Sequence, residues 1–326
     1  MNFPRIPKEA KILVTGAAGF IGSHFVEMLF DGNHTGEVLL LDRLSKGGKR
    51  DNITKFLKNQ NFLFLEADIL DVPRYKEFLE QCEFVFHFAA ESHVDRSIDN
   101  PDGFVDANVV GTYRLLEACR KFPAIRFVMI STDEVYGSNL GQPSRELDPF
   151  LPSSIYSASK AAAELLCLAN FKTHNQDIVI VRSCNNFGPR QDIEKFIPTV
   201  ITKILEGEAV PVYGSGENIR EWIDVRENVK AIAYIGLKGP RGEAFNVGSG
   251  IRLKNLELIH LLSASLPGYD TRITFVADRK GHDARYALDS TKIEKSLGWI
   301  YSKDFQESID ETIKWFEPPV TSERNL

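Results

Sequence analysis

The segment ILVTGAAGFIGSHF, residues 12–25, most restricts what this chain can become. An apolar run leads into Gly16, Gly19 and Gly22, and a helical pattern follows. Glycines between a strand and a helix make a tight turn where backbone amides and the helix dipole can approach a pyrophosphate. Asp42 ends the next apolar run, VLLLD, twenty positions after Gly22, where a carboxylate can accept the hydrogen bonds of an adenosine ribose. The pattern predicts a dinucleotide site on a strand, turn and helix.

Asp42 also bears on the choice of dinucleotide. Its charge would repel a 2′-phosphate, which favours NAD over NADP as the cofactor. Four nearby basic residues could instead pair with such a phosphate: Arg43, Lys46, Lys49 and Arg50. Asp68 and Ile69 follow the third apolar run, where we expect them to contact the edge of the adenine; a solvated Asp at a strand end is the alternative.

Short apolar runs alternate with longer amphipathic stretches along the first 185 residues. Six runs are typical of buried strands: Lys11–Thr15, Glu37–Leu41, Phe62–Glu66, Phe84–Phe88, Phe127–Ile130 and Ile178–Val181. Three stretches between them have helical periodicity: Ile21–Phe30, Asn108–Lys121 and Ser157–Thr173. This alternation predicts an α/β fold with a doubly wound parallel sheet that helices cover on both faces.

The pattern changes after about Asn185. NNFGPRQ and PVYGSGENIREW read as loops rich in Gly and Asn, with a helix at Phe196–Glu206 between them. Two later segments read as helices, Asn255–Ser265 and Ser302–Phe316. The segment Glu227–Gly236 and the strand-like Ala244–Val247 would return to the first domain. We expect an NAD-binding domain of residues 1–185 plus about 223–248. A smaller mixed α/β substrate-binding domain would contain about 186–222 plus 249–326.

Charge and composition exclude several kinds of partner. The formal net charge is −6, whereas nucleic acids and acidic membranes attract clustered Lys and Arg. No run reaches the roughly 18 apolar residues of a membrane span, and the N-terminus lacks the apolar core of a signal peptide, so we expect a cytoplasmic protein. The four cysteines show no CxxC spacing: Cys82, Cys119, Cys167 and Cys184. No cluster of His, Cys and Asp residues in the sequence suggests a metal site.

Two further motifs carry chemistry. Tyr156 and Lys160 in YSASK lie one helical turn apart, so their side chains share a face. A tyrosine titrates at roughly pH 10, and a cation beside the phenolate lowers that pKa, which would make Tyr156 a general base. A surface pair is the alternative interpretation. The second motif, STDEVYG, puts Asp133 and Glu134 after a buried strand, where the residues alone allow either a solvated loop or a functional pair.

The two carboxyl groups can serve one ligand only under a geometric condition. Adjacent side chains of an extended strand point to opposite faces, so the strand must end near Thr132 and DEVYG must turn, which Gly137 permits. Neighbouring carboxyl groups disfavour double ionisation. One of them can therefore act as an acid while the other acts as a base.

TGAAGFIGS, STDEVYG and YSASK, in this order, resemble the extended short-chain dehydrogenase/reductase superfamily, in which a Rossmann domain precedes a nucleotide-sugar-binding portion. Within it, AAESHVDRSI, CNNFGP, EKFIP and GHDARYALD are most similar to the dTDP-glucose 4,6-dehydratase family, and the match spans Ile12 to about Trp299. The resemblance implies a hydro-lyase of deoxysugar biosynthesis with tightly bound NAD. It also implies a homodimer in which the helices at Asn108–Lys121 and Ser157–Thr173 form a four-helix bundle.

The family's chemistry assigns a role to each residue of the two motifs. Thr132 would position the sugar's 4-hydroxyl, and Tyr156, supported by Lys160, would take its proton as hydride leaves C4. The C5 hydrogen then lies next to a ketone, and Glu134 would remove it. Asp133 would protonate the departing 6-hydroxyl.

The resemblance extends to further positions. Five more residues would line the cofactor: Phe20, Ile21, Ala89, Ala90 and Ser92. Asn108 would belong to the cofactor site and support the active-site backbone. His93 would approach the substrate, or simply pack. Asn186 would contact the substrate diphosphate, and Arg220 and Arg279 would clamp it. Glu194 and Lys195 would lie near the base and the sugar; surface charges are the alternative for these groups.

The chain departs from the family pattern in three places. Ser45–Gly48 replaces a Thr-Tyr-Ala-Gly run, Arg190–Ile193 replaces a segment with more aromatic residues and proline, and Glu221 stands where Asp is usual. The nucleobase is therefore open between thymine and uracil. A 4,6-dehydratase acting on a UDP-sugar, and a nucleotide-sugar 4-epimerase or decarboxylase, are alternative enzymes. A catalytically silent regulator that binds NAD or a sugar nucleotide is an alternative of another class.

Overall fold

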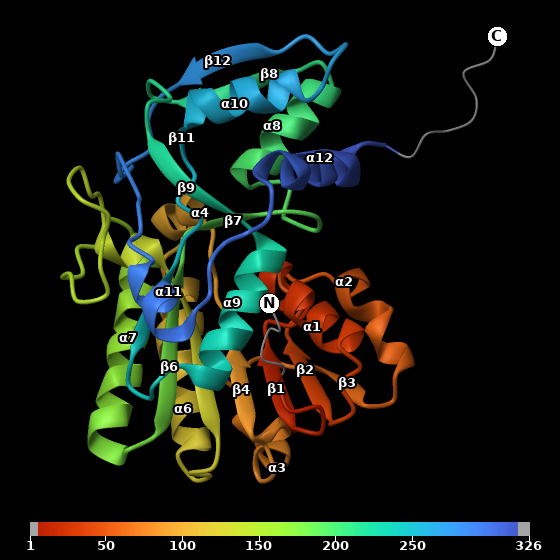
Figure 1. Cartoon of the computed structure of the whole chain (residues 1–326), viewed down its shortest axis with the longest axis vertical. Coiled ribbons are helices and arrows are strands. Elements are labelled where there is room, and N and C mark those ends of the chain that lie inside the picture. Colours follow the sequence, from red (N-terminus) through yellow and green to blue (C-terminus); the bar gives the residue numbers. More distant parts are fainter. Residues whose placement is uncertain (1–5, 319–326) are drawn as a thin grey trace.

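The computed structural model describes residues 6–318, and its centre is a seven-stranded sheet (Figure 1). The strand order is β10-β6-β5-β4-β1-β2-β3, and every neighbouring pair is parallel. Its strands are β1 (Ile12–Thr15), β2 (Val38–Asp42), β3 (Phe62–Glu66), β4 (Phe84–His87), β5 (Arg126–Thr132), β6 (Asp177–Ser183) and β10 (Ala244–Val247). The chain order reverses between β1 and β4. Ligands bind at such a switch point, outside the carboxyl ends of the strands.

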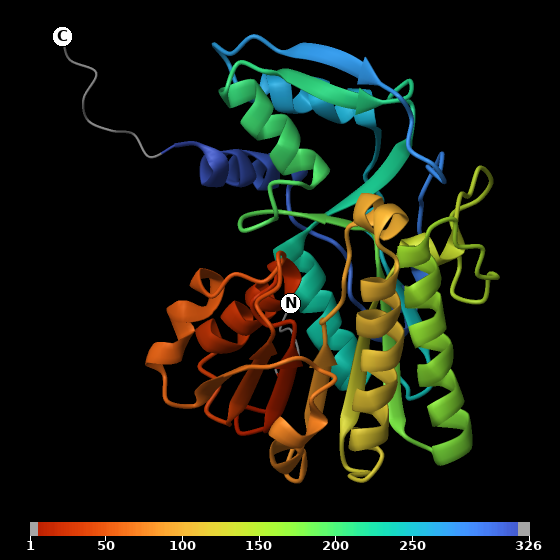
Figure 2. The ribbon, with the colours of Figure 1, turned by 180° about the vertical axis from the view of Figure 1, so that it is seen from behind.

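Helices cover both faces of this sheet. One face carries α1 (Phe20–Asp31), α9 (Val225–Lys238) and α11 (Thr291–Leu297) (Figure 1), and the other carries α6 (Thr112–Cys119) and α7 (Ile155–His174) (Figure 2). Short helices occupy the connections: α2 (Asp51–Thr54), α3 (Lys76–Leu79), α4 (Val94–Asp99) and α5 (Asp102–Phe104). Within residues 6–318, no helix has the length and apolar character needed to cross a bilayer.

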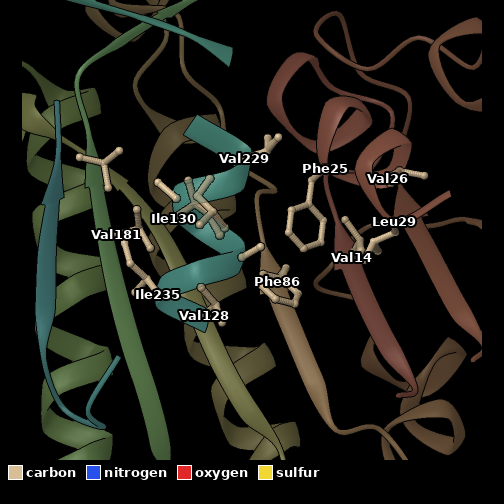
Figure 3. Close-up of a cluster of buried hydrophobic side chains, with 14 of the residues drawn as sticks. Val14, Phe25, Val26, Leu29, Phe86, Val128, Ile130, Val181, Val229 and Ile235 are labelled. Atoms are coloured by element: carbon tan, nitrogen blue, oxygen red, sulfur yellow. The ribbon is translucent and has the colours of Figure 1, made fainter. Parts of the chain in front are cut away.

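The core between α1, α9 and the sheet is made of interlocking apolar side chains (Figure 3). Phe25 of α1 packs against Phe86 of β4, with ring centroids 4.3 Å apart. Val128 of β5 and Ile235 of α9 belong to the same fully buried cluster. Burying these side chains contributes about 2 kcal/mol each, which holds the strand ends in fixed positions.

Two smaller sheets build the second part of the molecule. One has the order β11-β9-β7 and the other pairs β12 with β8. The strands are β7 (Asn185–Phe187), β8 (Ala209–Tyr213), β9 (Ile219–Asp224), β11 (Arg252–Lys254) and β12 (Arg272–Val276). Three helices complete it: α8 (Phe196–Leu205), α10 (Asn255–Ala264) and α12 (Phe305–Phe316). In Figure 1 this part lies above the carboxyl edge of the large sheet.

The strand predictions of the first 185 residues and two of the three helix predictions are confirmed, with shifted ends, but the loop predictions after them are partly wrong. PVYGSGENIREW contains most of β8 and β9, joined by a turn at 214–218. The burial of β8 alternates, with Val210 and Val212 inward, and Pro211 is tolerated because β8 pairs with one strand only. The helix expected at Asn108–Lys121 is interrupted, since a π-helix over Val105–Gly111 precedes α6.

Candidate active site

One elongated pocket of about 320 Å³ lies along the carboxyl ends of β1 to β6. It has the size and position expected of a ligand site in a doubly wound fold. Most of the residues predicted from the sequence line it: Gly16, Gly19, Phe20, Ile21, Gly22, Asp42, Asp68, Ile69, Ala89, Ala90, Ser92, His93, Thr132, Asp133, Glu134, Tyr156, Lys160, Asn186 and Lys195.

At one end, the glycine turn and Asp42 form a cradle. A Cβ at Gly22 would overlap the carbonyl oxygen of Gly16, so the start of α1 can approach the turn only without a side chain there. Asp42 is buried, and its carboxylate accepts the backbone amides of Ala18 and Leu44, at 2.9 and 2.8 Å. These bonds hold the carboxylate at the pocket wall with lone pairs to spare. The arrangement fits the ribose and pyrophosphate of a dinucleotide.

Arg43 spans the same end of the pocket. Its guanidinium donates to Asp68 Oδ2 at 2.8 Å, after β3, and to Glu91 Oε1 at 2.5 Å, after β4. Arg43, Asp68 and Glu91 all line the pocket, whereas Lys46, Lys49 and Arg50 do not. The basic residue nearest to Asp42 is thus already neutralised by two carboxylates. This arrangement favours a ribose without a 2′-phosphate.

At the other end, β5 stops where the two-acid arrangement requires. The strand ends at Thr132, and Asp133–Tyr136 forms one 3₁₀ turn that Thr132 caps by accepting the amide of Glu134, at 3.3 Å. The turn closes at Gly137, which has φ +68° and ψ −163°. Both Asp133 and Glu134 therefore face the pocket instead of opposite sides of a strand.

The two acids differ in their electrostatic surroundings. Burial raises the pKa of Asp133 well above its ordinary value, and the charges of Glu134 and Glu221 raise it further. Burial also raises the pKa of Glu134, but three cations act against the increase: Arg279, Lys195 and Arg220. Asp133 Oδ2 is buried without a hydrogen-bond partner among residues 6–318. Asp133 is therefore the better proton donor, and Glu134 the better base.

Tyr156 and Lys160 lie in the first turns of α7, which a capping box of Ser154 and Ser157 starts. The expectation that Lys160 lowers the pKa of Tyr156 is wrong for the protein alone. Burial and the charges of Glu134 and Asp133 raise that pKa, and only the hydrogen bond with Thr132 opposes them. Lys160 Nζ donates to the carbonyl oxygen of Ile130 at 2.6 Å. Burial lowers the pKa of Lys160 to about 8.

Four predicted residues do not line the pocket. Asn108 lies behind it, where its side chain holds the backbone of Glu91 and donates to Ser159 Oγ at 2.8 Å. Arg220 is buried over the ring of Tyr286 and donates to the carbonyl of Asp283. Two others are engaged in ion pairs: Glu194 with Arg96, and Arg279 with Asp95.

Several pocket residues were not predicted from the sequence. Ser183 and Cys184 line the pocket because β6 runs two residues further than predicted, to Ser183. The rule that ligands meet the carboxyl ends of parallel strands would have found them. Gln191 and Asp192 also form part of the wall, within the segment that departs from the family pattern.

The third departure, Glu221, is structural. Its Oε1 accepts the amide of Gly250 at 2.9 Å, and its Oε2 accepts Arg252 Nε and the amide of Leu288, at 2.9 and 3.0 Å. The residue is fully buried and does not line the pocket. The longer side chain of Glu joins two loops of the second part of the molecule.

The model of the family described as GDP-mannose 4,6 dehydratase matches residues 13–312. The chain belongs to this family. Among relatives, it is 44% identical over 305 residues to the "Low-salt glycan biosynthesis protein Agl12" of Haloferax volcanii, covering 94% of this chain and 98% of that protein. It is 43% identical over 311 residues to the dTDP-glucose 4,6-dehydratase of an Actinoplanes species, covering 94% and 97%.

A solved structure of the family is similar over the same range. DesIV, a dTDP-glucose 4,6-dehydratase from Streptomyces venezuelae with NAD and TYD bound, has a TM-score of 0.91 and 41% identity. The match covers 94% of this chain and 96% of that one. Similarity at this level extends to both parts of the molecule, the large sheet and the smaller sheets above it.

Replacing Gly137 tests the closure of the acid turn. Gly137→Ala would place a Cβ onto the carbonyl oxygen of Leu151 at a backbone geometry that alanine rarely adopts. We expect the free energy of unfolding to fall by about 2 kcal/mol because of this strain. Denaturant unfolding measures the change. Gly141→Ala, on the following loop and with no tight contact, is the control and should have little effect. Equal effects of the two substitutions would show that position 137 has no special need for glycine.

Proposed function

We propose that this protein is an NAD-dependent dTDP-glucose 4,6-dehydratase, a hydro-lyase that converts a dTDP-hexose to its 4-keto-6-deoxy derivative. The observation that carries the proposal is the single turn Asp133–Tyr136, which presents Asp133 and Glu134 to the pocket that also contains Tyr156 and the glycine turn. Membership of the 4,6-dehydratase family supports it. The names of the relatives, dTDP-glucose 4,6-dehydratases among them, support the substrate.

The cofactor is NAD, for which the cradle of Gly22 and Asp42 is suited. Gly16, Gly19, Asp42 and Asp68 would hold its adenosine and pyrophosphate, and Arg43 is paired with acids, so a 2′-phosphate gains little. Bound NAD would supply the hydride acceptor for C4, a further positive charge in the pocket, and the hydride that C6 receives, so that the net change is the loss of one water.

The chain's own residues move the protons. Thr132 orients the 4-hydroxyl, and Tyr156 takes its proton once its phenol can ionise. The electrostatic difference between the acids then sets the elimination: Glu134, with cations nearby, removes the proton at C5, and Asp133, protonated, delivers its proton to the 6-hydroxyl as water leaves. Glu134 would return its proton to C5 when C6 receives the hydride. A protonated Asp133 also leaves one negative charge fewer beside Tyr156, which favours the phenolate.

The geometry disfavours the alternatives. A 4-epimerase or decarboxylase has no elimination for Asp133 to assist, and a silent binder has no need of a buried acid with an unpaired oxygen. A UDP-sugar as substrate is the nearest rival, because the wall segment Arg190–Ile193 differs from the family pattern. The dTDP-glucose 4,6-dehydratases among the relatives favour the dTDP-sugar.

We further propose that the molecule works as a cytoplasmic homodimer with the domain division predicted from the sequence. The helices α6 and α7 lie side by side on the face seen in Figure 2. Apolar side chains stay exposed there: Val105, Tyr113 and Leu165 are 44%, 45% and 56% exposed. A second copy could cover them across a two-fold axis, which would form the four-helix bundle.

Turnover of a nucleotide sugar tests the function directly. We expect incubation with dTDP-glucose to yield a product lighter by one water, and UDP-glucose and the N-acetyl analogues to react more slowly. Mass spectrometry of the reaction mixture measures both. A faster reaction with UDP-glucose would replace the proposed substrate, while an epimer of unchanged mass would replace the proposed reaction.

Exchanging each acid for its amide separates the two roles. Glu134→Gln should oxidise C4 but stall before elimination, so that the absorbance of reduced nicotinamide persists after substrate is added. Its turnover should fall by about 10² or more, the usual contribution of a general base. Asp133→Asn is the matched comparison and should slow water loss more than C4 oxidation. Full turnover of Glu134→Gln, or equal loss of both steps in Asp133→Asn, would contradict the assignments.

Substitution on the exposed helix face tests the dimer. We expect the wild type to sediment as a dimer at micromolar concentration and Leu165→Arg as a monomer, because a charge cannot be buried unpaired in an apolar interface. Leu140→Arg, at an apolar residue that is 79% exposed in a loop, is the control and should leave the dimer intact. A monomeric wild type would refute the interface.

A further inference from the structure

Arg190 has an unusual backbone conformation in the segment that joins β7 to α8. Its φ is +66°, the left-handed region that residues with a Cβ seldom occupy. Gly, and less often Asn, adopts this conformation readily, but the residue at this position is Arg. The conformation therefore persists because contacts around it hold it in place.

Two side chains of α1 make those contacts. Arg190 Nη2 donates to Glu27 Oε2 at 2.5 Å and to His24 Nδ1 at 2.7 Å, and the guanidinium side chain is only 8% exposed. His24 Nε2 lies 2.8 Å from the carbonyl oxygen of Pro189. A carbonyl can only accept, so Nε2 carries the proton and Nδ1 offers its lone pair to Arg190. His24 thereby holds two consecutive residues of the turn.

The protonation state of His24 suits this arrangement. Burial and the charge of Arg190 lower the pKa of His24 to about 4, so the ring is neutral near pH 7. Glu27 also pairs with Lys55 on its exposed side. His24 and Glu27 are three positions apart on α1 and share a face of that helix.

The residues that follow Arg190 build one wall of the pocket. Gln191, Asp192 and Lys195 line it. Gln191 Nε2 donates to the carbonyl of Asn186, at 2.8 Å, and Lys195 Nζ to that of Ser92, also at 2.8 Å. The same α1 starts at the glycine turn. Arg190 thus connects the helix of the dinucleotide cradle to the pocket wall at residues 191–195.

We propose that His24, Glu27 and Arg190 form a latch that sets the position of the wall segment 191–195, and that Arg190 is a positioning residue for the sugar nucleotide. The inference rests on the proposed function and adds to it a determinant of substrate affinity outside the pocket. The latch keeps the wall ordered before substrate arrives. Its loss should weaken binding of the sugar nucleotide without changing the chemical steps.

The substitution Arg190→Gly removes the latch and also relieves the backbone strain at this position. In Arg190→Gly, we expect KM for dTDP-glucose to rise about tenfold, because the wall would hold its binding-competent conformation in only about a tenth of the molecules. We expect kcat to change by less than about twofold. NAD content per chain should stay at the wild-type level. Asn33→Gly, another left-handed residue, just past the end of α1, is the control for the backbone and should leave KM unchanged.

A second variant separates loss of the latch from a change in the backbone of the turn. Glu27→Gln leaves residues 188–195 untouched and should raise KM in the same direction, and faster hydrogen exchange in the wall segment 191–195 should accompany both substitutions. An unchanged KM in Arg190→Gly and Glu27→Gln would overturn the latch. A parallel loss of kcat and NAD would do so too, since it would indicate general support of the fold.

Binding of dTDP and UDP, measured by calorimetry, separates this proposal from the function. If the wild type dehydrates no sugar nucleotide, the proposed function fails, but weaker binding of either nucleotide to Arg190→Gly still supports the latch. Equal binding to wild type and variant overturns it. A wild type that binds neither nucleotide overturns both.

Discussion

The point at which β5 ends controls what the pocket can contain. One more extended residue would send Asp133 and Glu134 to opposite faces of the sheet, with one acid in the core. The cap by Thr132 and the glycine geometry at 137 prevent this, and both depend on a strand held by neighbours on each side. The apolar core beneath thus determines the positions of polar groups that contribute little to it.

Burial has a second effect, because the same desolvation acts differently on the two acids. Asp133 has acidic neighbours, so desolvation and repulsion act in the same direction. Glu134 lies near cations from three separate segments, and these cations partly offset the effect of burial on its pKa. The proposed roles of acid and base therefore depend on burial and on charged residues from distant segments, although the two acids are adjacent in the chain.

The sequence predicted those parts of the molecule whose signals are local. The glycine turn, Asp42 and the buried strands are read from short patterns, and the structure places them as expected. The strands β8 and β9 were missed because Pro211 within β8 and the glycines of the turn between the strands suggested a loop; both strands pair with segments distant in the chain. The pairing of Arg43 and the latch at Arg190 join residues tens to more than a hundred positions apart, which no local pattern reveals.

Early and late segments of the chain supply different parts of the pocket wall. Residues 16–160 contain the glycine cradle and the residues proposed to transfer protons, and the rest of the wall, from Ser183 onward, comes from later segments. Substitutions in the later segments can therefore alter which nucleotide or hexose is accepted while the redox centre is preserved. The segment around Arg190 belongs to this later part of the wall, so substitutions there can change specificity without altering the glycine cradle.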